Sequence, residues 1–365
     1  SWETISPDLT TNNEDLQRQK ESGGLTIDNT TAENHCTIFS ICESPLNKNI
    51  IWVGTDDGNL QVTTDDGEKW RKVSDGIEGL PQGTWVSCVE ASSHNPNEAF
   101  VTFDGHRTGD MRPHVYHTVD MGRSWTRITT EELYGHAHVI RQDPVNADLL
   151  FLGTEKGLFI TLDQGLHWAR FEENFPQVSV RDIVIQQREN SLVAGTHGRG
   201  IIILDDITPL RQLKSEILAE DVTIMSSKAA VLRIPRGGGA AAGNTHFAAD
   251  NPRSSAVLTY YLKKRHMFGE MKIEIFTPEG ELLKTLPGSK RKGMNFVTWS
   301  PRLKPPKVAP SPTMNPRTSF AGAMGPNAPE GRYRYVLTKG KKTYEGFVDV
   351  AYDKAYPHSK ADRKV

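Results

Sequence analysis

The chain has 365 residues, enough to bury a sizeable core and to form two domains. Its 43 Lys and Arg residues nearly balance 45 Asp and Glu, and no run of basic residues suggests a nucleic-acid partner. The longest apolar runs have the length of a strand, so no segment of this sequence is expected to span a membrane. With 31 Gly, 21 Pro and short β-branched apolar runs, the composition predicts an all-β fold.

In chain order, the apolar runs predict a short strand at 2–6, a polar segment at 8–35, and then sets of about four strands. The sets repeat at intervals of roughly 40 to 50 residues, which is typical of β-propeller blades. They are expected near 36–43, 50–55, 59–64 and 69–73; 84–91, 98–104, 113–118 and 124–128; 137–142, 149–154, 157–162 and 167–171; and 179–186, 191–196 and 200–205.

One motif, Thr-x-Asp-x-Gly-x-x-Trp, ends the third strand of three of these sets, in "TTDDGEKW", "TVDMGRSW" and "TLDQGLHW". The Asp can accept hydrogen bonds from turn amides, the Gly can adopt positive φ, and the Trp can bury its ring against a neighbouring sheet. We therefore expect a structural role in hairpin turns for twelve residues: Thr63, Asp65, Gly67, Trp70, Thr118, Asp120, Gly122, Trp125, Thr161, Asp163, Gly165 and Trp168.

This motif resembles the Asp-box, or BNR repeat, of sialidase-like and sortilin-like β-propeller proteins of the exported bacterial type. The resemblance implies a propeller portion of about four blades, the last without an Asp-box, and an extracellular or cell-envelope location. In related folds the Asp-box turns lie at the rim, away from the central channel. The boxes are specific for the fold and much less so for activity.

The opening "SWETISPDLT" aligns with the end of an Asp-box, because Trp2 corresponds to Trp70 and Trp125. We therefore expect the strand at 2–6 to be the outer strand of a further blade. On this interpretation, residues 1–213 are the C-terminal part of a larger propeller. The expected partners are the remaining blades, on the same parent protein or on a companion chain.

A second domain follows, with residues 214–255 as linker and first strands and a β-sandwich of about seven short strands at 256–352. Hairpins are predicted around 278–280 and 339–340. The run "KIEIFTPEGELLKTL…GMNFVTWS…GRYRYVLTKGKKTYEGFVDV" is similar to the immunoglobulin-like domain of flagellar hook-cap proteins. A long Pro-rich loop at 302–329 interrupts the strands, and a polar tail occupies 353–365.

The loops joining second to third strands usually lie on the face of a propeller that binds the ligand. In this chain they gather charged and imidazole groups that could hold a polar ligand, a peptide terminus or a sugar. Solvated loop charges that pair with one another are the alternative interpretation. The candidates for this face are Asp56, Asp57, His106, Arg107, Asp110, Arg112, His114, Glu155, Lys156, His197 and Arg199. Among these, His197 and Arg199 stand beside glycines that let the backbone turn tightly.

The sequence predicts neither a metal site nor a cofactor. Four residues have side chains of the kinds that bind metals: His106, His114, Asp57 and Asp110. They do not share a helix or strand at the spacing of metal ligands, so they do not predict a metal site.

Two functions remain open, and the first is favoured: a non-catalytic propeller that binds protein or glycan, with the sandwich as spacer or docking module. The alternative is a glycoside hydrolase, which needs two facing carboxylates about 5 to 9.5 Å apart. Asp57 and Glu155 are the nearest candidates for that pair, two blades apart. A sialidase would also need a Tyr nucleophile, which these loops lack.

Overall fold

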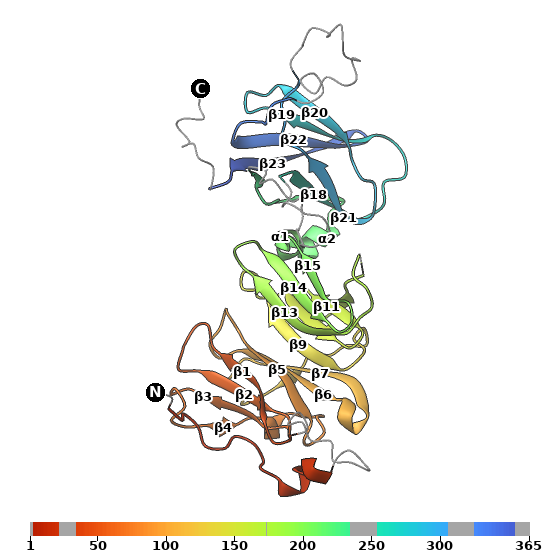
Figure 1. Cartoon of the computed structure of the whole chain (residues 1–365). Helices are drawn as coiled ribbons and strands as arrows, with labels where there is room; N and C mark the ends of the chain where they lie inside the picture. Colours follow the sequence, from red (N-terminus) through yellow and green to blue (C-terminus); the bar gives the residue numbers. More distant parts are fainter. Residues whose placement is uncertain (1–2, 22–33, 173, 234–253, 306–324, 355–365) are drawn as a thin grey trace, which may run out of the picture. The chain divides into compact units, whose positions relative to one another are not determined.

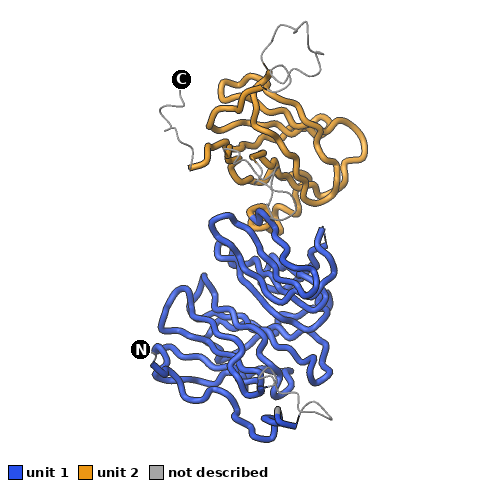
Figure 2. The backbone as a smooth tube through the Cα atoms, in the orientation of Figure 1, with its two compact units in different colours: residues 1–207 blue, residues 208–365 orange. Residues whose placement is uncertain are grey.

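The computed structural model describes residues 3–21, 34–172, 174–233, 254–305 and 325–354. Within these ranges the protein is almost entirely β-structure (Figure 1). The chain divides into two compact units, Ser1–Ile207 and Thr208–Val365 (Figure 2). No helix in the described part of the chain is long and apolar enough to cross a membrane.

The first unit consists of four antiparallel sheets, each built from strands that follow one another in the chain. We call them blades one to four. Blade one holds β1 (Ile38–Glu43), β2 (Ile51–Thr55), β3 (Leu60–Thr63) and β4 (Arg71–Lys72), and blade two holds β5 (Trp85–Ala91), β6 (Ala99–Gly105), β7 (Asp110–Thr118) and β8 (Thr126–Arg127). Blade three holds β9 (Ala137–Gln142), β10 (Leu150–Thr154), β11 (Gly157–Thr161) and β12 (Ala169–Arg170), and blade four holds β13 (Val180–Gln186), β14 (Ser191–Thr196) and β15 (Ile201–Leu204). Short 3₁₀ turns lie at η1 (Glu14–Leu16), η2 (Gln19–Glu21), η3 (Ser74–Gly76) and η4 (His106–Thr108).

The four blades stack face to face through their first strands. β5 packs on β1, β9 packs on β5, and β13 packs on β9. Because blades two and three each have a neighbouring blade on both faces, their second strands, β6 and β10, are buried along their whole length, as their continuous apolar runs predict. The predicted set of propeller strands is confirmed, including a last blade of three strands.

The structure corrects the element expected at 2–6, since the described residues 3–6 are not in a strand. This segment instead lies against blade one through side-chain hydrogen bonds. The carbonyl oxygen of Ile5 accepts from Trp70 Nε1 at 3.2 Å, and that of buried Leu9 accepts from Asn59 Nδ2 and Gln61 Nε2. Its carbonyl groups are therefore satisfied by side chains of blade one rather than by a neighbouring strand.

The second unit is a sandwich of two sheets. One sheet has the order β16 (Val222–Met225), β18 (Ala256–Leu262), β21 (Gly293–Trp299), and the other β17 (Ala230–Leu232), β23 (Lys342–Tyr352), β22 (Gly331–Lys339), β19 (Met271–Phe276), β20 (Leu282–Pro287). The helices α1 (Thr208–Gln212) and α2 (Ser215–Ala219) precede them. Both predicted hairpins are present, as β19–β20 and β22–β23.

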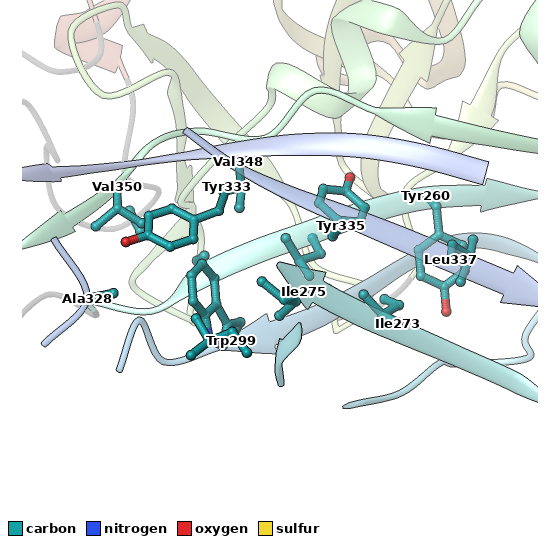
Figure 3. Packing of buried hydrophobic residues seen from close by; sticks show 14 of the residues in the cluster. Tyr260, Ile273, Ile275, Trp299, Ala328, Tyr333, Tyr335, Leu337, Val348 and Val350 are labelled. Carbon is teal, nitrogen blue, oxygen red and sulfur yellow. The ribbon is translucent and has the colours of Figure 1, made fainter. Parts of the chain in front are cut away.

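The core of this second unit lies between its two sheets. Tyr260 and Trp299 from one sheet meet Ile273, Tyr333 and Tyr335 from the other (Figure 3). These positions alternate along their strands with more exposed residues, which is the pattern expected of a strand buried on one face. Much of the expected loop at 302–329, most of the tail at 353–365, and residues 22–33 lie outside the described residues.

Candidate functional site

The three repeated turns have the same hydrogen bonds. In the first, the Thr63 hydroxyl donates to Asp65 Oδ1 at 2.8 Å and accepts from the Gly67 amide, while the Lys69 amide also donates to Asp65 Oδ1. The corresponding bonds recur around Asp120 and Asp163. Each glycine has positive φ, from 72° to 96°. The carboxylates therefore have their hydrogen bonds within their own turns.

The tryptophan of each turn contacts the preceding stretch of chain. Trp125 Nε1 donates to the carbonyl oxygen of Val73 at 3.1 Å, and Trp168 Nε1 donates to that of Ile128 at 2.8 Å. Both acceptors come directly after the outer strand of the preceding blade. In blade one, the carbonyl oxygen of Ile5 is the corresponding acceptor for Trp70 Nε1.

Two of the residues expected on the ligand face, Asp56 and Asp57, are buried and hold the chain that precedes β1. Asp56 accepts from the amide and hydroxyl of Thr37. Asp57 accepts from the amide and hydroxyl of Thr11, each at 2.7 Å, and from the Thr55 hydroxyl. Burial would raise the pKa of Asp57, but the hydrogen bonds from Thr55 and Thr11 outweigh it and lower that pKa.

A second group of expected residues pairs locally on β7. Arg112 binds Asp110 with two hydrogen bonds of 2.7 and 2.8 Å, and buried His114 contacts the same carboxylate through Nε2 at 2.9 Å. The bond from Arg112, followed by that from His114, holds the pKa of Asp110 well below its usual range. Lys156, His197 and Arg199 are exposed.

The structure gathers a different cluster at the junction of blades two and three. Asp104 is the last residue but one of β6, and His106 begins η4. His136 and His138 flank the first residue of β9, and Glu155 lies between β10 and β11. The alternation of the strand places His136 and His138 on one side of β9. The Glu155 amide donates to the carbonyl oxygen of His136, which fixes the β10–β11 turn beside β9.

Two carboxylates lie on either side of the imidazoles. Asp104 Oδ1 contacts His106 Nδ1 at 2.7 Å, and its Oδ2 lies 3.9 Å from His136 Nε2 and 3.8 Å from His138 Nδ1. Glu155 Oε2 lies 3.2 Å from His138 Nε2 and 3.8 Å from His136 Nε2. Arg181 Nη2 also donates to Glu155 Oε2, at 3.2 Å.

Burial disfavours the charged form of both the His136 and the His138 imidazole. It lowers the pKa of His136, and together with the nearby charge of Arg181 it lowers the pKa of His138 to about 4. For Glu155, burial would raise the pKa, but hydrogen bonds with Ser179 and His138 and the charge of Arg181 lower it. The cluster thus combines imidazole nitrogens with the carboxylates of Asp104 and Glu155, groups that can accept hydrogen bonds or ligate a cation.

Aromatic rings continue this cluster across blades one to three. Phe39 packs edge-on to Trp85 at 4.4 Å between ring centroids, and His106 stacks on His136 at 4.8 Å. Trp85 and His106 lie 6.4 Å apart, and the guanidinium of Arg107 lies 4.3 Å from the Trp85 ring centroid. Phe39 is 53% exposed, so the row begins at the surface. We call Phe39, Trp85, Arg107, His106 and His136 the aromatic row.

Of the residues expected on the ligand face, the structure brings His106, Arg107 and Glu155 together, and leaves Asp57 and the Asp110 group with separate partners. The sequence does not predict five further residues of the site: Asp104, His136, His138, Trp85 and Phe39. One signal could have found two of them: "GHAHVI" places two His two apart at the start of a first strand, hence on one side of it.

Comparisons with known proteins show likeness in structure only. No protein-family model and no curated protein sequence matches the chain. Among solved structures it is similar to YCF48 from Cyanidioschyzon merolae, with 19% identity and a TM-score of 0.37 over 46% of this chain and 52% of that one. It is also similar to YCF48 bound to a D1 peptide, with 15% identity and a TM-score of 0.31 over 53% of this chain and 73% of that one.

A third likeness is to the GH74 xyloglucanase from Xanthomonas campestris, with 10% identity and a TM-score of 0.41. It covers 86% of this chain and 45% of the xyloglucanase, so the chain spans about half the length of that enzyme. At these identities and TM-scores, none of the matches bears on activity, and the function is argued from the site itself.

Proposed function

We propose that the chain is a non-catalytic binding and scaffold module that recognises a protein or a glycan through the aromatic row, as part of a larger protein or complex outside the cell or in the cell envelope. The observation that carries this proposal is the row itself, in which an exposed Phe39 leads to Trp85 with Arg107 over its face. Rings with an adjacent guanidinium and imidazoles recognise ligands by stacking and by hydrogen bonds.

A polypeptide is the favoured ligand because β1, the strand that carries Phe39, has further apolar side chains exposed to solvent. Ile38 and Ile41 of this strand are 43% and 66% exposed. Exposed aliphatic side chains on a strand that also bears an exposed aromatic ring suit apolar side chains of a peptide. Sugars would use the ring face and the polar groups but gain little from the isoleucines.

The partners of the carboxylates favour binding over catalysis. Asp104 has a side chain only 3% exposed, and Asp57 is held by Thr11 and Thr55. A general acid or nucleophile of a glycosidase must reach the scissile bond. Glu155, with a side chain 32% exposed, is the carboxylate of this cluster that a glycan could approach. The alternative, a glycoside hydrolase, therefore depends on Glu155.

The test compares matched pairs of aromatic and arginine residues. Phe39→Ala and Arg107→Ala remove the exposed ring and the cation of the row, while Phe347→Ala and Arg332→Ala remove a similar pair in the second unit, 5.0 Å apart. The proteins are screened on a random peptide library and a glycan array. We expect to find ligands that bind Phe39→Ala and Arg107→Ala about tenfold more weakly than the wild type, and that bind Phe347→Ala and Arg332→Ala as tightly as the wild type. Equal losses in both pairs would contradict the site.

A third arm addresses the alternative. Wild-type protein and Glu155→Gln are incubated with glycans bound on the array, and new reducing ends are measured. Release by the wild type that the variant abolishes would replace binding by hydrolysis as the function.

We also propose that blade-like polypeptide covers the open faces of blades one and four. Ile201 and Ile203 on β15 are 71% and 56% exposed, in an element whose counterparts in other blades are buried. At the other end, the carbonyl oxygen of Ile5 accepts the hydrogen bond from the tryptophan of blade one. In blades two and three, a carbonyl oxygen of the preceding blade accepts this bond. Ile203→Asp should abolish association with such a partner, measured by light scattering and cross-linking. An unchanged assembly would contradict this proposal.

A further inference from the structure

His136 is a buried side chain without a hydrogen bond. Its side chain is 8% exposed, and neither ring nitrogen has a hydrogen-bond partner among the residues that the structure describes. Its Nε2 instead points between two carboxylate oxygens, Glu155 Oε2 at 3.8 Å and Asp104 Oδ2 at 3.9 Å. Neither nitrogen of His136 is among the fully buried, unsatisfied atoms of the described residues, so a small ligand can reach the space between these groups.

The neighbours of His136 complete a set of ligand atoms. One ligand atom each from His136, His138 and Glu155 lie within 4.8 Å of one another. In a tetrahedral site with bonds of about 2.0 to 2.2 Å, ligand atoms are about 3.3 to 3.6 Å apart. The 3.2 Å from His138 Nε2 to Glu155 Oε2 is close to this spacing, and the 3.8 Å from His136 Nε2 to Glu155 Oε2 exceeds it by a few tenths of an ångström.

Charge in the cluster also favours a cation. Asp104 and Glu155 bring two carboxylates, while Arg181 brings one positive charge and forms its ion pair with Glu155. The side chain of Arg181 is 47% exposed, so it can turn into solvent when an ion arrives. Asp104 Oδ2 lies 3.8 Å from His138 Nδ1, the ring nitrogen opposite the one that faces Glu155. Carboxylates in this position orient a ligating histidine.

We propose that His136, His138 and Glu155 bind one divalent transition-metal ion of the Zn²⁺ type, with Asp104 orienting His138. Two imidazoles and one carboxylate suit zinc and leave a further coordination position open, on the side of the half-exposed Glu155. The ion ties β9 to the turn between β10 and β11, and it sits beside His106 at the inner end of the aromatic row. This inference stands on the geometry of the cluster and does not depend on the proposed function.

The experiment uses untagged protein stripped with a chelator and titrated with Zn²⁺ alone in a calorimeter at neutral pH. We expect one ion per chain with micromolar affinity or tighter. Glu155→Gln and His136→Phe should each weaken binding at least about tenfold. His167→Gln is the matched control, because His167 forms a similar 2.7 Å pair with Asp163 but is 82% exposed and belongs to no group of three ligands among the described residues. Its affinity should equal that of the wild type.

Co²⁺ provides a second readout, since its visible absorption reports the coordination of the bound ion. We expect a four-coordinate spectrum in the wild type and in His167→Gln that is lost in Glu155→Gln. Circular dichroism checks that each variant is folded; because Glu155 is partly exposed, its variant carries the test if His136→Phe unfolds. Absence of stoichiometric binding in the wild type, or equal binding in Glu155→Gln, would overturn the proposal. Neither result bears on the proposed binding of a peptide or glycan, because that binding is measured in the absence of added metal.

Discussion

The indole nitrogen of Trp168 donates a 2.8 Å hydrogen bond to the carbonyl oxygen of Ile128, which belongs to the preceding blade. The same bond joins Trp125 to Val73. Each repeated turn therefore positions a ring that satisfies a carbonyl group of its neighbour. The motif that defines the turn also fixes how two blades pack, so one substitution affects both.

Replacing Trp168 by Phe should destabilise the first unit by about 2 kcal/mol, through loss of the hydrogen bond and of part of the buried ring. Trp168 is buried, whereas Trp70 is partly exposed, so Trp70→Phe should cost less. Urea unfolding followed at equilibrium measures both. Equal effects would contradict the importance of burial at this contact.

Gly122→Ala should destabilise the same unit by about 1 to 3 kcal/mol. Gly122 has a φ of 72°, and a Cβ atom there would lie 3.0 Å from the Cβ of Val73. Gly109→Ala is the control: its φ is 86°, but an added Cβ meets no atom within 4 Å. Thermal unfolding of the two variants separates the crowding at Gly122 from the strain that both share. If they are equally destabilised, crowding against Val73 plays no part.

The lowered pKa of Asp120 predicts that the first unit loses stability in acid. Hydrogen bonds from the hydroxyl and amide of Ser124 lower its pKa to about 2. A carboxylate whose pKa falls on folding stabilises the folded state above its unfolded pKa, and this stabilisation disappears as pH falls through the folded value. Between about pH 4 and 2, the wild type should therefore lose more stability than Asp120→Asn, which has no proton to bind. Melting temperatures across this range test it, and parallel curves would contradict it.

Tyr335→Phe should leave the second unit as stable or more stable, by about 1 kcal/mol. The Tyr335 hydroxyl is buried without a hydrogen-bond partner in the described part of the chain, and burial raises the pKa of Tyr335 to about 12. Removing an unsatisfied polar group removes its desolvation cost. Tyr260→Phe is the matched control, because its hydroxyl donates to the carbonyl oxygen of Ser289 at 2.6 Å. That variant should lose about 1 to 2 kcal/mol in urea unfolding, and a loss in Tyr335→Phe would contradict the prediction.

The sequence predicts the strands well because repetition and alternation are local signals. β9 and its neighbours follow from apolar runs between turn residues, and the three turns follow from fixed spacing within eight residues. The predicted strand at 2–6 is wrong because the partner of Ile5 is the side chain of Trp70, which no local pattern near Ile5 contains. The same holds for Leu9, whose partners are the side chains of Asn59 and Gln61.

The site is predicted only in part, for the same reason. Glu155 and His106 are found because they stand in loops of one class, but Asp104 lies within the buried strand β6, so the sequence pattern assigns it to the core. His136 and His138 acquire their role only when blade three places them against blade two. Distances such as 3.8 Å between His136 and Glu155 arise from packing, which a single sequence does not encode in any short window.

The bonds from Trp70, Trp125 and Trp168 to the preceding chain have a consequence for how the propeller unfolds. The free energy of unfolding of the propeller is then a sum over blades and over the interfaces between neighbouring blades, as in a one-dimensional array. A blade with a neighbour on both faces is stabilised by two such interfaces, whereas blades one and four are each stabilised by one interface within the described chain. Amide hydrogens should therefore exchange fastest in the terminal blades, and opening should spread inward from them.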